Sequence, residues 1–163
     1  MKILISILIF FIFSLGIKAN TLDDVKNRGY LICGIAENIT GFATLNDKGE
    51  WTGFDIQICR AVAAAVFGDS KKVEFISTTS RSRFPILASG EIDLLVRNTT
   101  WTFSRDSNLG FEYSGINFYD GQGFMVSKSL GISSVFELSG ATVCIESGSA
   151  KEFNVTSYFF KNN

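Results

Sequence analysis

The sequence predicts an α/β fold built around a parallel β-sheet. Between residues 30 and 97, three short apolar stretches alternate with two helical patterns, in the order strand, helix, strand, helix, strand. Each helical pattern ends at a glycine, as helices commonly do. This order is typical of parallel strands joined by right-handed crossovers, with helices covering the sheet.

The first elements follow from short local signals. Residues 21–27 are predicted to form a helix, because Thr21-x-x-Asp24 has the pattern of a capping box. A strand is expected over residues 30–36, where apolar residues alternate. The following stretch, residues 38–52, is expected to be a loop with a turn at residues 46–49.

The first helical pattern covers residues 54–67 and ends at Gly68-Asp69. Its apolar residues recur at positions i, i+3, i+4 and i+7, which forms one apolar face. These residues are Cys59, Val62, Ala63 and Val66. A strand over residues 72–77, a helix over residues 80–89 and a strand over residues 91–97 complete the pattern.

The N-terminal segment, residues 1–19, has the three parts of a secretory signal peptide. A positive start at Lys2 precedes an apolar run over residues 3–17, and Ala19 stands at a suitable cleavage position. The run is shorter than the roughly 20 residues of a membrane-spanning helix. The first cysteine is Cys33, so no lipid-anchored cysteine follows the cut. We therefore expect a free periplasmic protein, secreted through a cleaved leader.

Composition argues against several classes of function. The chain has 163 residues and a net charge of −1, with no basic patch of the kind that binds nucleic acid. It contains no histidine, which removes the commonest general base and a common metal ligand. Its three cysteines lack the spacing of a metal site. We therefore expect no metal, no cofactor and no catalytic residue.

The cysteines leave two interpretations open. Cys33 lies in the first strand and Cys59 in the helix that packs on it, so the pair forms either a disulfide or two buried free thiols. Cys144 is either buried and free, or paired with a cysteine outside this chain.

A binding site is expected beyond the carboxyl ends of the strands, where open α/β sheets bind ligands. The residues that follow the strands are rich in hydroxyl groups and aromatic rings, and two arginines, Arg83 and Arg105, lie close by. Arginine grips carboxylates through paired hydrogen bonds, so an anionic ligand fits this edge.

These residues resemble the periplasmic amino-acid-binding proteins of ABC importers, solute-binding protein family 3, and among them the general L-amino-acid-binding type. The resemblance spans essentially all of the expected mature chain, and residues 97–107 are its most specific part. The family signature stands at residues 53–58, where Gln57 replaces its second acid. The segments that carry the resemblance are residues 21–35, 51–70, 83–107 and 119–127.

The resemblance implies a periplasmic-binding-protein type II fold, a three-layer α/β/α arrangement with two lobes. Lobe one would cover residues 20–118, and residues 119–163 would form the crossover and the start of lobe two. Relatives of this kind continue well beyond Asn163, so the resemblance also implies that lobe two is incomplete and the sequence truncated.

The resemblance also implies roles for individual residues. Arg105 would hold the ligand carboxylate, assisted by Thr100, and the backbone carbonyl of Asn98 would meet the ammonium group. Arg83 would face the ligand as in relatives that bind acidic amino acids. Three further ligand-binding positions are Phe42, or Ile39 in its place, as an apolar wall near the first strand, and Gly148 and Ser149 in the loop of lobe two.

The pattern Ser149-x-x-Glu152 supports this loop independently, because a capping box predicts a helix N-terminus there. A helix N-terminus favours an anion, so a carboxylate held between it and Arg105 would bridge the two lobes and favour their closure. The Phe-rich stretch over residues 153–160 is predicted to be core.

Purely structural interpretations of these residues remain open. Arg105 could pair with Asp106 or Glu112 at the surface, Arg83 could lie on a solvated helix face, and Ser149 could be a cap without a ligand. Among functions, a monomeric receptor that delivers L-amino acids to an ABC permease is the leading hypothesis. The alternatives are an enzyme on the same fold, similar to cyclohexadienyl dehydratase, and a sensor domain of a larger receptor.

Overall fold

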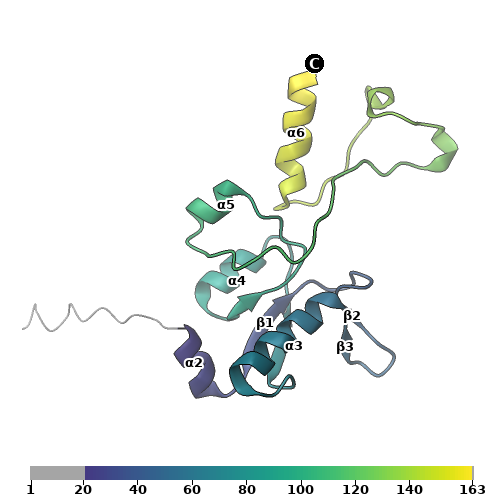
Figure 1. Cartoon of the computed structure of the whole chain (residues 1–163). Helices are drawn as coiled ribbons and strands as arrows, with labels where there is room; N and C mark the ends of the chain where they lie inside the picture. Colours follow the sequence, from purple (N-terminus) through teal and green to yellow (C-terminus); the bar gives the residue numbers. More distant parts are fainter. Residues whose placement is uncertain (1–20, 163) are drawn as a thin grey trace, which may run out of the picture.

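The computed structural model describes residues 21–162, so the expected signal peptide lies outside the described residues. The elements, in chain order, are α2 (Thr21–Arg28), β1 (Leu31–Ile35), β2 (Thr44–Leu45), β3 (Trp51–Thr52), α3 (Phe54–Phe67), β4 (Val73–Ser77), α4 (Arg83–Ser89), β5 (Leu94–Leu95), α5 (Phe103–Asn108), the 3₁₀ turns η1 (Lys128–Leu130) and η2 (Val135–Leu138), and α6 (Ala150–Asn162). Figure 1 shows these elements along the chain.

The three main strands form a parallel sheet in the order β4-β1-β5, which confirms the predicted fold class. Strand β1 is central and pairs with β4 over its whole length, from Leu31 opposite Val73 to Ile35 opposite Ser77. The crossovers from β1 to β4 and from β4 to β5 run in opposite directions across the sheet. For right-handed connections this puts α3 and α4 on opposite faces, and it makes the end of β1 a switch point in the strand order.

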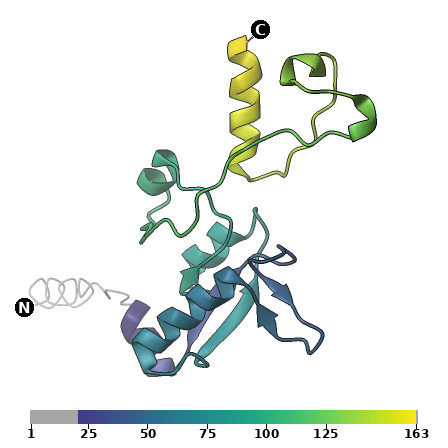
Figure 2. The ribbon, with the colours of Figure 1, turned by 45° about the vertical axis from the view of Figure 1, so that its right-hand side comes forward.

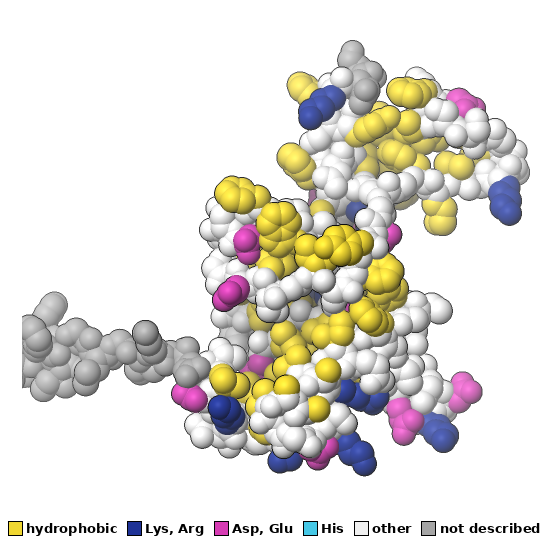
Figure 3. Space-filling model, viewed as in Figure 1, with side chains coloured by type: hydrophobic (Ala, Val, Ile, Leu, Met, Phe, Trp, Pro, Cys, Tyr) yellow, Lys and Arg dark blue, Asp and Glu magenta, His cyan; other side chains and the backbone are white. Residues whose placement is uncertain are grey.

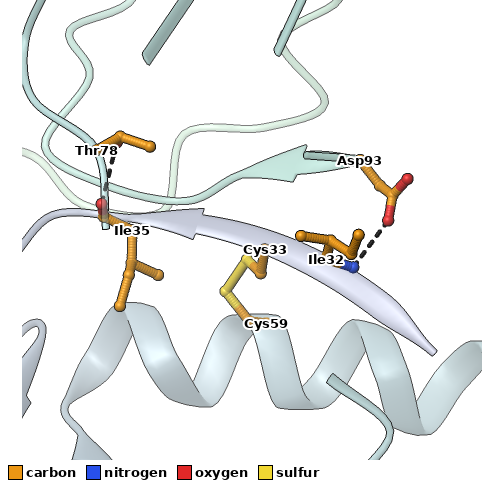
Figure 4. Close-up of a disulfide and its surroundings, with 6 residues drawn as sticks. All are labelled: Ile32, Cys33, Ile35, Cys59, Thr78 and Asp93. Atoms are coloured by element: carbon orange, nitrogen blue, oxygen red, sulfur yellow. Dashed lines mark hydrogen bonds between the residues drawn. A yellow bond between two sulfur atoms is a disulfide. The ribbon is translucent and has the colours of Figure 1, made fainter. Parts of the chain in front are cut away.

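The structure joins Cys33 of β1 to Cys59 of α3 by a disulfide, one of the two outcomes left open by the sequence (Figure 4). Their Cα atoms lie 6.2 Å apart, within the range that a disulfide spans, and both residues are fully buried. The surrounding core includes Leu31, Ile35 and Ile56. The apolar face predicted for α3 therefore packs on the sheet, and a covalent bond fastens it there. Cys144, by contrast, is exposed and free.

Gly53 links the hairpin β2–β3 to the start of α3. Its φ angle is 124°, a region that side chains avoid, and a Cβ atom there would lie 2.2 Å from the carbonyl oxygen of Phe42. The same oxygen accepts a hydrogen bond from the backbone N–H of Asp55 at 3.0 Å. Glycine therefore allows the hairpin to lie directly on the first turn of the helix.

Three sequence predictions differ from the structure by more than one residue at an end. The expected loop over residues 38–52 contains the β2–β3 hairpin, although its predicted turn at residues 46–49 is present. Helix α4 begins at Arg83 rather than at residue 80, because Thr79 and Ser82 exchange side-chain and backbone hydrogen bonds that form a turn first. The third strand is assigned only over Leu94–Leu95.

The C-terminal part, residues 111–162, is far less packed than the sheet. Helix α6 stands away from the sheet, and the chain before it is largely without regular structure (Figures 1 and 2). The prediction that residues 153–160 are core is wrong, because Phe153 is 75% and Phe160 is 87% exposed. Within residues 111–162 there is no strand on which α6 could bury them. Hydrophobic side chains accordingly show on the surface around this helix (Figure 3).

Another helix, α5, was not expected from the sequence. Thr102 begins it as an N-cap, with its hydroxyl oxygen accepting a hydrogen bond from the backbone N–H of Arg105 at 3.2 Å. In residues 21–162, none of the helices has the length and apolar character needed to cross a membrane.

The disulfide predicts a measurable loss of stability. Replacing both Cys33 and Cys59 by serine should lower the free energy of unfolding by about 3–4 kcal/mol, since the bond closes a chain segment whose ends are 26 residues apart. Urea denaturation under oxidising conditions measures this. Replacing the exposed Cys144 by serine is the control and should leave the unfolding midpoint unchanged. An equal midpoint for the double variant and the wild type would contradict the structure.

Candidate functional site

The carboxyl ends of the strands meet at one edge of the sheet, where a buried arginine organises the loops. The hydroxyl and N–H of Thr78, just after β4, both donate to the carbonyl of Ile35 at the end of β1, at 3.0 and 2.8 Å. Arg97, just after β5, donates to the carbonyl of Thr78 at 2.6 Å and to its hydroxyl at 3.2 Å. Arg97 therefore ties together the ends of all three strands.

Arg97 also fixes Asn98, which was predicted to meet the ligand. The Asn98 side-chain oxygen accepts hydrogen bonds from Nε and Nη2 of Arg97, at 3.2 and 3.0 Å. Arg97 was not among the binding residues predicted from the sequence. The available signal was an arginine directly after the apolar run Leu94–Val96, because a charged residue at the end of a buried strand needs partners.

Asp55, in the first turn of α3, is a second buried charge. Its side chain is 2% exposed, and its Oδ2 atom has no hydrogen-bond partner among the described residues. Burial raises the pKa of this carboxyl, and the positive charge of Arg97 opposes that rise. The pair therefore places an under-satisfied carboxylate and a buried guanidinium beneath the edge of the sheet.

Arg83, at the start of α4, is buried with only 2% of its surface exposed. The reading that places it on a solvated helix face is therefore wrong. Its guanidinium donates to the hydroxyl of Thr99 at 3.4 Å and to the carbonyl of Gly148 at 3.2 Å. Its Nε has no partner among residues 21–162. Arg83 thus retains a buried donor without an acceptor.

Arg105, on α5, lies beside Arg83. It donates to the carbonyl of Thr100 at 2.9 Å and to the carbonyl of Gly148 at 3.4 Å. These contacts are with backbone carbonyls rather than with Asp106 or Glu112, the surface partners considered from the sequence. Both guanidiniums lie over the ring of Phe84. The Cζ atoms of Arg83 and Arg105 are 4.9 and 5.3 Å from the ring centroid.

The two guanidiniums therefore converge on a single neutral oxygen, that of Gly148. Burial, together with the charges of Arg97 and Arg105, lowers the pKa of Arg83 to about 10. Arg83 is thus still protonated near neutral pH. The hydrogen-bond acceptors of Arg83 and Arg105 are uncharged, so the pair can gain from an anionic acceptor, since charge-assisted hydrogen bonds are shorter and stronger than neutral ones.

The loop before α6 closes the site from the other side. Glu146 accepts a hydrogen bond from the hydroxyl of Ser80 at 2.6 Å. The capping box predicted here is only partly present. Glu152 does reach back to a backbone N–H, that of Gly148, at 3.2 Å, but the hydroxyl of Ser149 donates to the carbonyl of Glu146 instead of capping α6. The structure therefore turns a carbonyl of this loop, rather than its N–H groups, toward the arginines.

The structure brings together four of the seven predicted binding residues, which are Arg83, Thr100, Arg105 and Gly148. Phe42 lies in another cluster, where its ring packs edge-on against Phe54 and Phe118 at 6.0 and 5.0 Å. Sequence reasoning also missed Glu146, whose partner Ser80 is 66 residues away along the chain and gives no local signal.

Two surface grooves and the acidic side chains were the other candidates for a site among the described residues. Two surface grooves of about 510 and 380 Å³ lie apart from the arginines, the first between β3, α3 and β4 and the second beside α6. Among the residues that the structure describes, no buried, unpartnered donor lines either groove. Among residues 21–162, no group of three or more cysteine, aspartate or glutamate side chains could hold a metal ion. The arginine pair is therefore the best-built candidate site.

Comparison with known proteins identifies the family. Residues 31–161 match the family model of bacterial extracellular solute-binding proteins, family 3. The chain belongs to this family. Members similar to it include the glutamate/glutamine/aspartate/asparagine-binding protein BztA of Rhodobacter capsulatus, 55% identical over 90% of this chain and 43% of that protein. The general L-amino acid-binding periplasmic protein AapJ of Rhizobium johnstonii is 51% identical over the same shares.

A solved structure of a periplasmic binding protein agrees with the fold. A periplasmic binding protein from Brucella ovis with glutathione bound is 53% identical, with a TM-score of 0.83 over 88% of this chain and 46% of that one. The chain thus spans less than half the length of these relatives. The architecture of the described residues is accordingly that of a family 3 solute-binding protein over the matched part.

The buried carboxyl of Asp55 predicts a pH dependence of stability. Because the pKa of Asp55 is raised in the folded protein, the folded state holds a proton that the unfolded chain releases above about pH 4. The free energy of unfolding should therefore fall as pH rises from about 4 through the raised pKa. Asp55→Asn should remove this fall, as measured by urea denaturation at a series of pH values.

The control is Asp47→Asn, which changes an exposed carboxyl in the hairpin turn. It should keep the pH dependence of the wild type. If Asp55→Asn shows the same slope of stability against pH as the wild type and Asp47→Asn, the carboxyl of Asp55 is not perturbed by burial.

Proposed function

We propose that this chain is the carboxylate-gripping part of a periplasmic receptor that captures L-amino acids for an ABC transporter. The observation that carries the proposal is the convergence of Arg83 and Arg105 on one oxygen atom at the edge of the sheet. The names of the relatives, which describe amino-acid-binding proteins, support the same ligand class.

The ligand carboxylate would take the position that the Gly148 carbonyl holds now. One carboxylate can accept from both guanidiniums, and its charge would compensate two neighbouring positive groups. Thr100 and Asn98 lie on the exposed side of the same loop, where the ammonium group of the ligand would find backbone carbonyls. The receptor would therefore recognise the α-amino-acid group itself.

Two positively charged side chains also bear on the choice of ligand. Burial, and after it the charges of Arg97 and Arg105, lower the pKa of Arg83, so a further positive group near Arg83 is disfavoured. Ligands with acidic or neutral side chains should therefore bind better than ligands with basic ones. The name of BztA, which binds glutamate, glutamine, aspartate and asparagine, supports this preference.

Binding would also change how the loop before α6 lies on the sheet. A ligand carboxylate on the two arginines would displace the Gly148 carbonyl, and the ligand would shift the population toward the arrangement of the loop that it binds more tightly. A receptor of this kind acts in the periplasm, reached through the expected leader, and presents the ligand-bound form to its permease. The curated relatives are named as binding proteins, which supports capture rather than chemistry.

Calorimetric titration of the mature chain with the twenty amino acids tests this function. Arg105→Gln and Arg83→Gln should each weaken binding by roughly 10- to 100-fold, because each removes a hydrogen bond to a charged group worth about 1.5–3 kcal/mol. Arg60→Gln is the matched control, since Arg60 lies on α3 and donates to the carbonyl of Trp51 on β3, apart from the pair. It should bind like the wild type.

A second titration isolates the carboxylate. The α-amide of the amino acid that binds best should bind at least tenfold more weakly than the acid itself, because it cannot offer two charged oxygens. The proposed function fails if no amino acid binds the wild type. The site assignment fails if the acid and its α-amide bind equally, or if Arg105→Gln binds like Arg60→Gln.

A further inference from the structure

The loop before α6 occupies the place that the proposed function gives to the ligand. The carbonyl oxygen of Gly148 lies 3.2 Å from Nη2 of Arg83 and 3.4 Å from Nη2 of Arg105. A backbone carbonyl is a strong acceptor, but it has no net charge, and it can satisfy the pair only in part. The buried Nε of Arg83 remains without a partner among the described residues.

The position of this carbonyl depends on the conformation of Gly148. Its φ angle is 78°, in the left-handed region that glycine adopts without strain. A Cβ atom at this position would lie 3.1 Å from the carbonyl oxygen of Ser80 and 3.3 Å from Cγ of Arg81. A larger residue would therefore push the loop away from the start of α4, so the close approach needs glycine.

A separate contact holds the loop against the sheet. The hydroxyl of Ser80 donates to Oε1 of Glu146 at 2.6 Å, a short hydrogen bond to a carboxylate. Glu146 also lies close enough to Arg83 and Arg97 for its charge to favour their protonated forms. Glu146 stands two residues before Gly148, so this bond holds the Gly148 carbonyl close to the arginines.

We propose that residues 146–148 act as an internal ligand, in which the Ser80–Glu146 hydrogen bond is a latch that keeps the Gly148 carbonyl on the two arginines until an amino acid displaces it. The proposal rests on the proposed function for the nature of the displacing ligand. The latch itself rests on the contacts of Ser80, Glu146 and Gly148.

Removing the latch should change the apparent affinity for the ligand in the direction opposite to that of removing a ligand contact. If the binding-competent form is the one with the loop released, the apparent dissociation constant is the intrinsic constant divided by the fraction of released molecules. Weakening the latch raises that fraction and therefore tightens apparent binding. A residue that contacts the ligand would instead weaken binding when it is replaced.

Two variants weaken the latch to different degrees. Ser80→Ala removes the donor and leaves all charges in place, so apparent affinity for the amino acid that the wild type binds best should rise about five- to tenfold. Glu146→Gln keeps an acceptor oxygen but removes its charge, so the rise should be smaller. Ser89→Ala, at the far end of α4, is the control and should leave the affinity unchanged. Unchanged or weaker binding by Ser80→Ala overturns the latch.

A fluorine label gives a second readout that needs no ligand. Cys144 is the single free thiol, since Cys33 and Cys59 are bonded to each other, and it lies exposed two residues before Glu146. A trifluoromethyl group attached there should report the held and released loop in the ¹⁹F NMR spectrum. Ser80→Ala should shift the spectrum of the ligand-free protein in the direction that the amino acid shifts the wild type.

The two measurements separate the hypotheses. A wild type that binds no amino acid overturns the proposed function, and with it the role of the loop as an internal ligand. The fluorine spectra then still decide the latch, because identical ligand-free spectra for the wild type and Ser80→Ala mean that the Ser80–Glu146 bond does not hold the loop. Binding by the wild type, together with identical spectra, overturns the latch alone.

Discussion

The hydrogen bonding of the central strand β1 brings the ends of the three parallel strands together at the edge of the sheet where the site lies. Because β4 and β5 flank it in parallel, the chain leaves all three strands at the same edge of the sheet. The carbonyl of Ile35, at the end of β1, accepts two hydrogen bonds from Thr78, and Arg97 binds Thr78 in turn. The starting points of α4 and α5, the helices that carry Arg83 and Arg105, are therefore set by the sheet, and the Cys33–Cys59 bond holds α3 against it (Figure 4).

The unfavourable burial of Arg83 close to other guanidiniums explains why the site suits an anion. Burying guanidiniums near one another is unfavourable, and the lowered pKa of Arg83 expresses that cost. Neutral oxygens of Thr99, Thr100 and Gly148 compensate it only in part. An anion entering between Arg83 and Arg105 would gain what these acceptors cannot provide, so a fold that maintains such a pair is suited to capture a carboxylate.

Much of the fold was accessible from the sequence because its signals are local. Alternating apolar residues gave the strands, and the rule that ligands bind beyond strand ends selected Arg83 and Arg105. Contacts between distant segments were not accessible, so the bond from Ser80 to Glu146 and the role of Arg97 were missed. The Phe-rich helix α6 was predicted to be buried, but periodicity cannot tell whether the surface that would cover it is present in the same chain.

A crystal structure of the chain with its best-bound amino acid would show directly whether the arginine pair holds the ligand. We expect carboxylate oxygens within hydrogen-bonding distance of both Arg83 and Arg105, with the Gly148 carbonyl moved away from them. A ligand carboxylate bound elsewhere, while Gly148 still accepts from both arginines, would rule out this site.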